Sequence, residues 1–214
     1  MNEIEDRIAA GVATLGQVLP NGASGKLARL LSELERWNQR LNLTAIREPR
    51  EMVSAHVLDS LSLRPYLEGT RILDVGTGAG FPGLPLAVAE PQRQFLLLDS
   101  NARKIAFVKH MIADLALGNV TAIQARVEDF TADRLFDTVL ARALATLVRI
   151  VELCAHLAAE NGVLLAAKGK YPAEELEDLK KPPVDWDFRV IELQVPDLPP
   201  QSRHLVQLQR AGRS

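Results

Sequence analysis

A cluster of glycines directly after a short apolar run is the feature that most constrains this fold. Residues 71–75 read Arg-Ile-Leu-Asp-Val, and Gly76, Gly78, Gly80 and Gly83 follow at once. A short apolar run ending in turn residues is typical of a buried parallel strand. The last three glycines fit G-x-G-x-x-G, a spacing that permits a tight turn and lets a ligand approach bare backbone at a helix N-terminus. Alone, this glycine pattern does not indicate a ligand, because a tight strand-to-helix turn without a ligand can have the same pattern.

Apolar runs and helical patterns alternate after this loop. Helical periodicity predicts helices over residues 102–117, 147–159 and 173–180. The expected strands are residues 71–75, 95–98, 120–124, 136–140, 162–167, 188–195 and 204–208. Strands alternating with helices imply an α/β fold with a doubly wound, mostly parallel, seven-stranded sheet. A ligand then binds in the crevice at the carboxyl ends of the strands.

The first 64 residues have a different pattern. Apolar residues recur there at spacings of three and four, and no segment resembles a strand, so three helices are expected. Pro49 suits a helix start, whereas Pro182-Pro183 and residues 196–200 are expected to be loops. The sequence therefore predicts a helical extension over residues 1–64 and a ligand-binding domain over residues 65–214.

Composition restricts the partners. The 214 residues have a formal charge of −2, which excludes binding of nucleic acid or an anionic membrane through the overall field, so any such contact must be a local basic patch. One cysteine, Cys154, and four scattered histidines predict neither an intrachain disulfide nor a metal site. The acidic first residues lack the apolar segment of a signal peptide, and we expect a cytoplasmic, monomeric protein that does not enter membranes.

A carboxylate at the end of the second strand identifies the ligand class. Asp99 follows Leu96-Leu97-Leu98, where a carboxylate can accept hydrogen bonds from both ribose hydroxyls of an adenosine ligand. A phosphate-binding P-loop is excluded, because Gly25-Lys26 is followed by Leu27. Neither tyrosine begins the Tyr-x-x-x-Lys of short-chain dehydrogenases. S-adenosylmethionine fits best: Asp74 and the loop backbone can bind its amino-acid end, while Asp99 binds its ribose.

These residues carry a family resemblance. Asp74 to Gly80 followed by Asp99 resembles motif I and the acidic ribose site of Rossmann-like class I S-adenosylmethionine methyltransferases. More narrowly, the chain is similar to the ribosomal RNA small subunit methyltransferase G family, also called glucose-inhibited division protein B. The stretches that carry this likeness are residues 37–44, 56–61, 74–83, 126–128, 142–143, 165–169 and 203–205. The resemblance implies methylation of guanine N7 in 16S ribosomal RNA, with the small ribosomal subunit as partner. It places family cofactor positions on Gly76, Phe81, Val127, Glu128 and Arg142.

The chemistry of the nucleophile is consistent with this implication. Exocyclic amines usually need a Pro-Pro-aromatic loop after the fourth strand, where this chain has Leu140-Ala141-Arg142-Ala143. Pyrimidine C5 needs a thiolate, but Cys154 lies in an apolar helical pattern and is expected to be a buried small side chain. Guanine N7 has a lone pair and no proton to remove, so it needs alignment rather than a base. This argument does not select N7 over other ring nitrogens.

Three cations are expected to contact the base or RNA. Arg142, Lys168 and Arg203 each end, follow or precede a predicted strand at the rim where the methyl group should point, although each could also be an ordinary surface cation. His56, among apolar neighbours, is expected to be a half-buried histidine with its hydrogen bonds satisfied. Asn38 and Asn42 could line the substrate entrance or could simply cap the helix and contact solvent. Two alternatives stay open: a methyltransferase acting on a protein or small molecule, and a non-catalytic, cofactor-binding ribosome-assembly factor.

Overall fold

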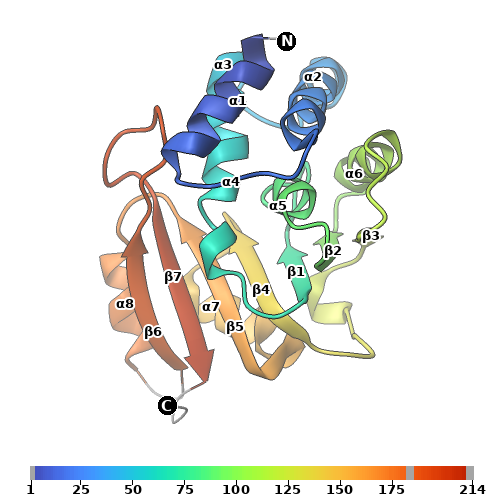
Figure 1. Cartoon of the computed structure of the whole chain (residues 1–214). Coiled ribbons are helices and arrows are strands. Elements are labelled where there is room, and N and C mark those ends of the chain that lie inside the picture. The colour runs from blue at the N-terminus through green and yellow to red at the C-terminus, as the bar shows by residue number, and fades with distance from the viewer. Residues whose placement is uncertain (1–2, 182–185, 211–214) are drawn as a thin grey trace.

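A seven-stranded sheet forms the centre of the computed structural model, which describes residues 3–181 and 186–210. The strand order is β3-β2-β1-β4-β5-β7-β6 (Figure 1). The strands are β1 (Arg71–Val75), β2 (Gln94–Asp99), β3 (Val120–Gln124), β4 (Phe136–Arg142), β5 (Ala158–Lys168), β6 (Trp186–Glu192) and β7 (His204–Arg210). The first five in the order are parallel, whereas β7 runs antiparallel to β5 and β6. The predicted α/β, mostly parallel sheet is confirmed.

The reversal of β7 has a direct consequence for the site. Lys168 at the end of β5 pairs with His204 at the start of β7. The beginning of β7 therefore lies at the same edge of the sheet as the carboxyl ends of β1, β4 and β5. Side chains distant in sequence meet there.

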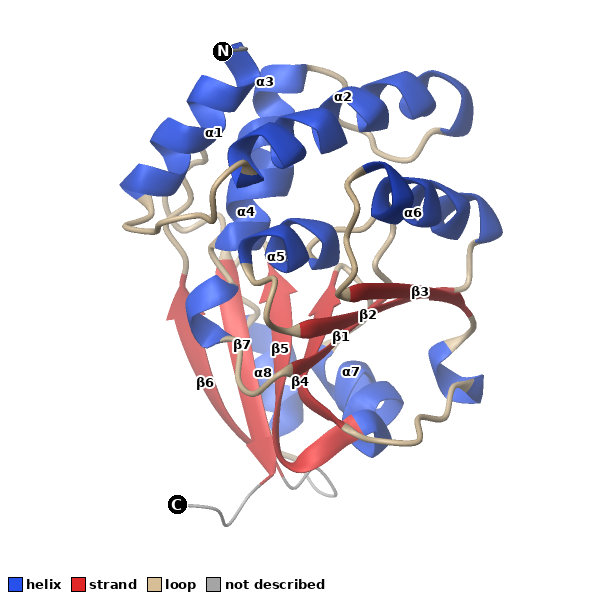
Figure 2. Ribbon diagram, turned by 45° about the vertical axis from the view of Figure 1, so that its right-hand side comes forward, coloured by secondary structure: helices blue, strands red, loops and turns tan. Residues whose placement is uncertain are grey.

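Helices cover both faces of the sheet (Figure 2). One face packs against α5 (Gly83–Ala89), α6 (Ala102–Asp114) and the N-terminal helices, and the other against α7 (Leu147–Cys154) and α8 (Ala173–Leu179). Successive residues of a strand alternate between these layers: Ile72 belongs to the first core and Leu73 to the second. Both faces are therefore buried, which explains the continuous apolar runs in the sequence.

The N-terminal extension is helical, as predicted. It comprises α1 (Glu3–Thr14), α2 (Ala23–Leu41), α3 (Pro49–Met52), a π-helix (Val53–Leu58), α4 (Asp59–Leu61) and a 3₁₀ turn (Arg64–Tyr66). Pro49 stands in the first turn of α3, as expected. Ile8 and Leu27 share one core with Leu84 and Ile72, so the extension has no separate core. The boundary at residues 64/65 marks a change of element type, and the two-domain division stays a prediction.

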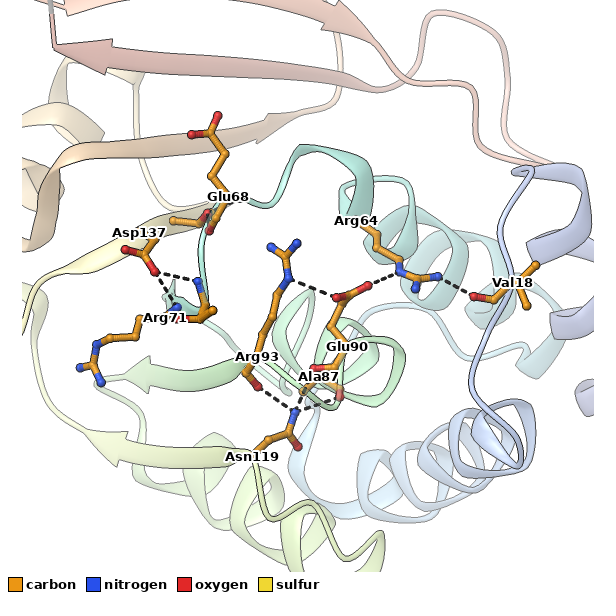
Figure 3. A network of polar contacts seen from close by, with 11 residues as sticks. Val18, Arg64, Glu68, Arg71, Ala87, Glu90, Arg93, Asn119 and Asp137 are labelled. Carbon is orange, nitrogen blue, oxygen red and sulfur yellow. Dashed lines mark hydrogen bonds and ion pairs between the residues drawn. The ribbon is translucent and has the colours of Figure 1, made fainter.

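A polar network joins the extension to the end of α5 (Figure 3). The Arg64 guanidinium donates to Glu90 at 2.6 Å and to the Val18 carbonyl at 2.7 Å. Asn119 donates to the carbonyls of Ala87, Glu90 and Arg93. Side chains thus satisfy the carbonyls at the end of α5, which a buried helix terminus requires.

Several predicted boundaries were wrong. The helix predicted over residues 147–159 ends at Cys154, a short 3₁₀ turn (Ala155–Leu157) follows, and Ala158 already begins β5. The predicted helix over 102–117 ends at Asp114, and β4 extends two residues further than expected, so Arg142 is its last residue. The loop expected at residues 196–200 is confirmed, whereas Pro182 and Pro183 lie outside the described residues.

None of the helices within the described residues is long and apolar enough to cross a membrane. No group of three or more histidine, cysteine, aspartate or glutamate side chains within residues 3–181 and 186–210 could hold a metal ion.

Candidate active site

The glycine loop turns sharply between β1 and α5. Gly76, Gly78 and Gly80 have φ values of 67°, 62° and 89°, in the left-handed region that favours glycine. The amides of Gly76 and Thr77 donate to the Leu98 carbonyl at 2.8 and 3.0 Å, which ties the loop to the end of β2. A Cβ at Gly80 would lie 2.3 Å from Leu84 Cδ1. The loop therefore depends on its glycines for conformation and for packing.

Asp74 braces this loop from beneath rather than lining an open pocket. Its side chain is buried, and Oδ2 accepts hydrogen bonds from Thr77 Oγ1 at 2.6 Å and from the Gly83 amide at 2.9 Å. Oδ1 is buried and has no hydrogen-bond partner among the described residues. Burial raises the pKa of Asp74 to about 6. An unpaired buried carboxylate oxygen is costly, and an ammonium group of a ligand would satisfy it.

A pocket of about 360 Å³ opens beside the loop, and we call it the cofactor pocket. It is lined by Gly76, Asp99, Val127 and Glu128 together with Lys104. Asp99 Oδ2 accepts from the Gly78 amide at 2.9 Å and Oδ1 from the Asn101 amide at 2.8 Å. Each carboxylate oxygen can accept a further hydrogen bond, so Asp99 can take two ribose hydroxyls.

The predicted cofactor residues fall into two groups. Gly76, Asp99, Val127 and Glu128 line the cofactor pocket, and Glu128 also lies 3.6 Å from Arg149. The other predicted positions do not line it: Gly78, Gly80 and Phe81 shape the loop, Asp74 lies behind it, and Arg142 lies in a second pocket. The assignment of all these residues to cofactor binding stays a prediction.

This second pocket, about 420 Å³ in volume, contains the three predicted cations, and we call it the cation-lined pocket. Arg142 ends β4, Lys168 ends β5, and Arg203 immediately precedes β7. Ala143 lines both pockets, so they adjoin at the end of β4. The cations therefore converge next to the cofactor pocket, as the substrate hypothesis requires.

Carboxylates pair with all three cations. Arg142 Nη1 lies 3.0 Å from Asp59 Oδ2, and Arg203 Nε lies 2.8 Å from Asp59 Oδ1. Lys168 Nζ lies 2.7 Å from Glu175 and 2.8 Å from the Ala145 carbonyl. The side chains are only 14–29% exposed, so these pairs are shielded from solvent more than surface pairs are. The cations have fixed positions, and because Arg142 and Arg203 share Asp59, two carboxylates compensate two of the three positive charges.

His56 differs from its prediction. It is buried, its Nε2 lies 3.0 Å from Thr44 Oγ1, and its ring stacks on Phe81 at 4.8 Å. Its Nδ1 has no partner in the described part of the chain, so the histidine is not fully satisfied. Burial and the nearby Arg142 lower the pKa of His56 to about 4, so the ring is neutral at pH 7.

Other predicted side chains have structural positions. Asn38 is buried and exchanges two hydrogen bonds with the Thr44 backbone, while Asn42 forms the left-handed C-cap of α2. Cys154 is fully buried, as expected, and burial raises its thiol pKa to about 12. A thiolate nucleophile is therefore absent at this position near neutral pH.

Sequence reasoning missed two carboxylates, Asp59 and Glu175. Asp59 stands between the apolar residues Leu58 and Leu61, and a buried acid in such a run is the signal that could have revealed it. Glu175 also accepts from the Leu147 amide at 2.7 Å, so it joins α8 to the start of α7. The Asp59 pairings do not follow from sequence spacing, because Arg142 and Arg203 lie 83 and 144 residues away, whereas Glu175 lies only seven residues after Lys168, across the turn between β5 and α8.

The fold is that of the class I methyltransferases. Among solved structures, the DhpI–SAH complex matches with a TM-score of 0.60 at 18% identity, covering 89% of this chain and 98% of that one. A SAM dependent methyltransferase from Aquifex aeolicus matches with a TM-score of 0.56 at 18% identity, over 74% and 91% of the two chains.

The sequence comparisons define the family more narrowly. Residues 23–206 match the family model described as rRNA small subunit methyltransferase G, and the chain belongs to this family. A relative named ribosomal RNA small subunit methyltransferase G from Nitrosococcus oceani is 47% identical over 97% of both chains. One of the same name from Idiomarina loihiensis is 48% identical over 83% of this chain and 84% of its own.

Proposed function

We propose that this chain transfers a methyl group from S-adenosylmethionine to N7 of a guanine in 16S ribosomal RNA. One observation carries the proposal: the cofactor pocket adjoins a pocket into which three separate segments bring Arg142, Lys168 and Arg203. Family membership supports ribosomal RNA as the substrate. The choice of N7 rests on the family resemblance and on the chemistry of the site.

The residues of the cofactor pocket fit S-adenosylmethionine. Asp99 in the pocket would accept hydrogen bonds from the ribose hydroxyls, and Asp74, behind the glycine loop, would accept from the ammonium group through Oδ1, which has no partner among the described residues. The glycine loop allows the ligand to lie against its backbone. When bound, the cofactor supplies an electrophilic methyl group on a sulfonium.

The cation-lined pocket would align the guanine base with the methyl group. Arginine side chains donate well to guanine O6 and to phosphate oxygens, whereas a donor to N7 would occupy the attacking lone pair. Arg142 is held by Asp59, and its guanidinium lies 5.9 Å above the Phe81 ring. With the base held near the methyl group and water excluded, catalysis follows from proximity.

Proton transfer is not required of any residue in this pocket. N7 has no proton, and the neutral His56 has its Nε2 against Thr44. The same chemistry makes a thiol unnecessary, which agrees with the burial of Cys154. The arrangement supports a nucleophile that is reactive in its neutral form.

A labelled-methyl transfer assay tests the proposal. The protein is incubated with labelled S-adenosylmethionine and small ribosomal subunits, naked 16S RNA, or ribosomal proteins. We expect label in RNA only. Label in protein would favour the alternative substrate class, and no label despite cofactor binding would indicate a non-catalytic assembly factor. Thermal stabilisation by S-adenosylmethionine but not by NAD or ATP verifies cofactor binding separately. Sedimentation and cell fractionation would check the monomeric, cytoplasmic state, which stays a prediction.

A further inference from the structure

The cation-lined pocket contains a carboxylate that binding of RNA phosphate does not require. The Asp59 side chain is 10% exposed and lines the pocket between Arg142 and Arg203. A carboxylate in a pocket that must accept a polyanion weakens phosphate binding. Asp59 holds the two arginines in place, and its remaining acceptor capacity indicates a second role.

Both oxygens of Asp59 retain hydrogen-bonding capacity. Arg142 Nη1 donates to Oδ2 at 3.0 Å and Arg203 Nε to Oδ1 at 2.8 Å, one bond to each oxygen. An ionised carboxylate has about four acceptor positions. One position on each oxygen is thus left for a ligand in the pocket.

The complement of two parallel acceptors is a pair of adjacent donors. Guanine has such a pair, N1–H and the N2 amino group, whereas adenine has an acceptor at N1 and no amino group at C2. Next to this pair guanine presents O6, an acceptor that arginine donors bind well. We propose that Asp59 accepts hydrogen bonds from N1–H and N2–H of the target guanine while Arg142 or Arg203 donates to O6.

This arrangement leaves N7 free. The Watson–Crick edge faces the carboxylate, so the N7 lone pair is not used in recognition and stays available for the methyl group. An enzyme that modifies a base commonly takes it out of the stack into a pocket, where that edge becomes accessible. A volume of about 420 Å³ lies within the roughly 300–1,000 Å³ usual for small-molecule sites.

The surrounding structure holds Asp59 rigidly. The residue follows directly on the π-helix (Val53–Leu58), its carbonyl accepts from Ser62 Oγ at 2.7 Å, and the two arginines fix its carboxylate from both sides. π-helical turns frequently occur at functional sites. A preorganised acceptor pair discriminates between bases more sharply than a mobile one.

The inference rests on the proposed function, and base replacement tests it. Small subunits are reconstituted with 16S RNA that carries either guanine or inosine at the methylated position, once that position is mapped. Inosine lacks only the N2 amino group. Because a hydrogen bond to a charged group is lost, we expect the wild-type enzyme to methylate the inosine substrate about tenfold more slowly or worse. Equal wild-type rates on both would overturn the inference without needing any variant.

The variant Asp59→Asn separates recognition from mere support of the arginines. An amide offers one acceptor and one donor, so it cannot accept from N1–H and N2–H together, and the ratio of the guanine rate to the inosine rate should fall well below the wild-type ratio. The matched control is Glu175→Gln, which removes the carboxylate beside Lys168 and should keep the wild-type ratio whatever its absolute rate. If Asp59→Asn slowed both substrates equally, Asp59 would be only a positioning residue. Failure of the proposed function is distinguishable, because wild-type enzyme would then leave guanine N7 itself unmethylated.

Discussion

The two adjoining pockets are built by different means. The cofactor pocket is shaped by the backbone of the glycine loop. Its glycines have left-handed conformations, its amides donate hydrogen bonds to Leu98 and Asp99, and buried Asp74 supports it from beneath. The cation-lined pocket depends on side chains from distant segments, held by the pairs with Asp59 and Glu175. Substitutions in the first should therefore affect folding and cofactor binding together, whereas substitutions in the second should affect methyl transfer with little effect on folding.

The largest expected effect is that of Gly80→Ala on the loop. Its φ of 89° disfavours any Cβ, and the added methyl would lie 2.3 Å from Leu84. We expect a loss of about 2–4 kcal/mol in the free energy of unfolding from strain and overpacking combined. Urea unfolding measures it. Gly16→Ala is the control, since it has a φ of 67° but open space around its Cβ, and should lose only about 1–2 kcal/mol. Equal losses would show that packing of the loop contributes nothing.

The second-largest effect is expected for Asp99→Ala, which should weaken cofactor binding. It removes the carboxylate predicted to bind the ribose and the acceptor for the Gly78 amide. We expect affinity for S-adenosylhomocysteine to fall about 100-fold, equivalent to the loss of two hydrogen bonds to a charged group. Calorimetric titration measures it. Asp133→Ala, an exposed carboxylate, should bind as the wild type does. Unchanged affinity in Asp99→Ala would remove the ribose assignment.

Arg142→Ala should separate the two pockets. We expect methyl transfer to small subunits to fall about 30-fold or more, by analogy with the loss of one charged donor in an active site, while the melting temperature changes little. Single-turnover transfer and thermal melting measure both quantities. Arg134→Ala, at the opposite edge of the sheet, is the control and should transfer normally. Parallel loss of transfer and stability would make Arg142 a structural residue.

The pH dependence of cofactor binding should be smaller. Burial raises the pKa of Asp74 to about 6, and only the ionised carboxylate attracts an ammonium group. Affinity should therefore rise about tenfold between pH 5 and 7, and Asp74→Asn should abolish the rise. The effect on folding has the opposite sign: between about pH 4 and 6 the folded state binds more protons than the unfolded state, so this group's contribution to stability falls as pH rises. A flat wild-type affinity profile would exclude the ammonium contact.

Cys154→Ala should have the smallest effect. The thiol is buried and its pKa is raised to about 12, so it takes no part in transfer. We expect rates within about twofold of wild type and a stability loss on the order of 1 kcal/mol from the vacated volume. A large loss of transfer without unfolding would restore the thiolate mechanism that the sequence argued against.

The sequence predicted the central strands well because they are buried on both faces. The apolar run at residues 71–75 therefore stands out and matches β1, and the prediction at residues 120–124 also matches β3, although this edge strand has exposed residues. Helical periodicity extended the predicted helix to Ala159, but pairing of Ala158 with Phe136 makes Ala158 the start of β5. The π-helix before Asp59 has no sequence signature that would have revealed it.

Candidate site residues could be predicted only where they end or adjoin strands. Arg142, Lys168 and Arg203 do so, and the structure brings them into one pocket, while their contact with the substrate stays a prediction. Asp59 was missed because its pairing with Arg203 depends on the antiparallel course of β7 and on how the extension packs. The predicted basic rim is also less basic than expected, since two carboxylates compensate two of its three positive charges.

Identification of the methylated atom tests the central claim most directly. Small-subunit RNA is treated with the protein and labelled S-adenosylmethionine, digested to nucleosides and analysed by mass spectrometry. The account predicts a single labelled product, 7-methylguanosine. Label on an exocyclic amine, on a pyrimidine or on another ring nitrogen would contradict it.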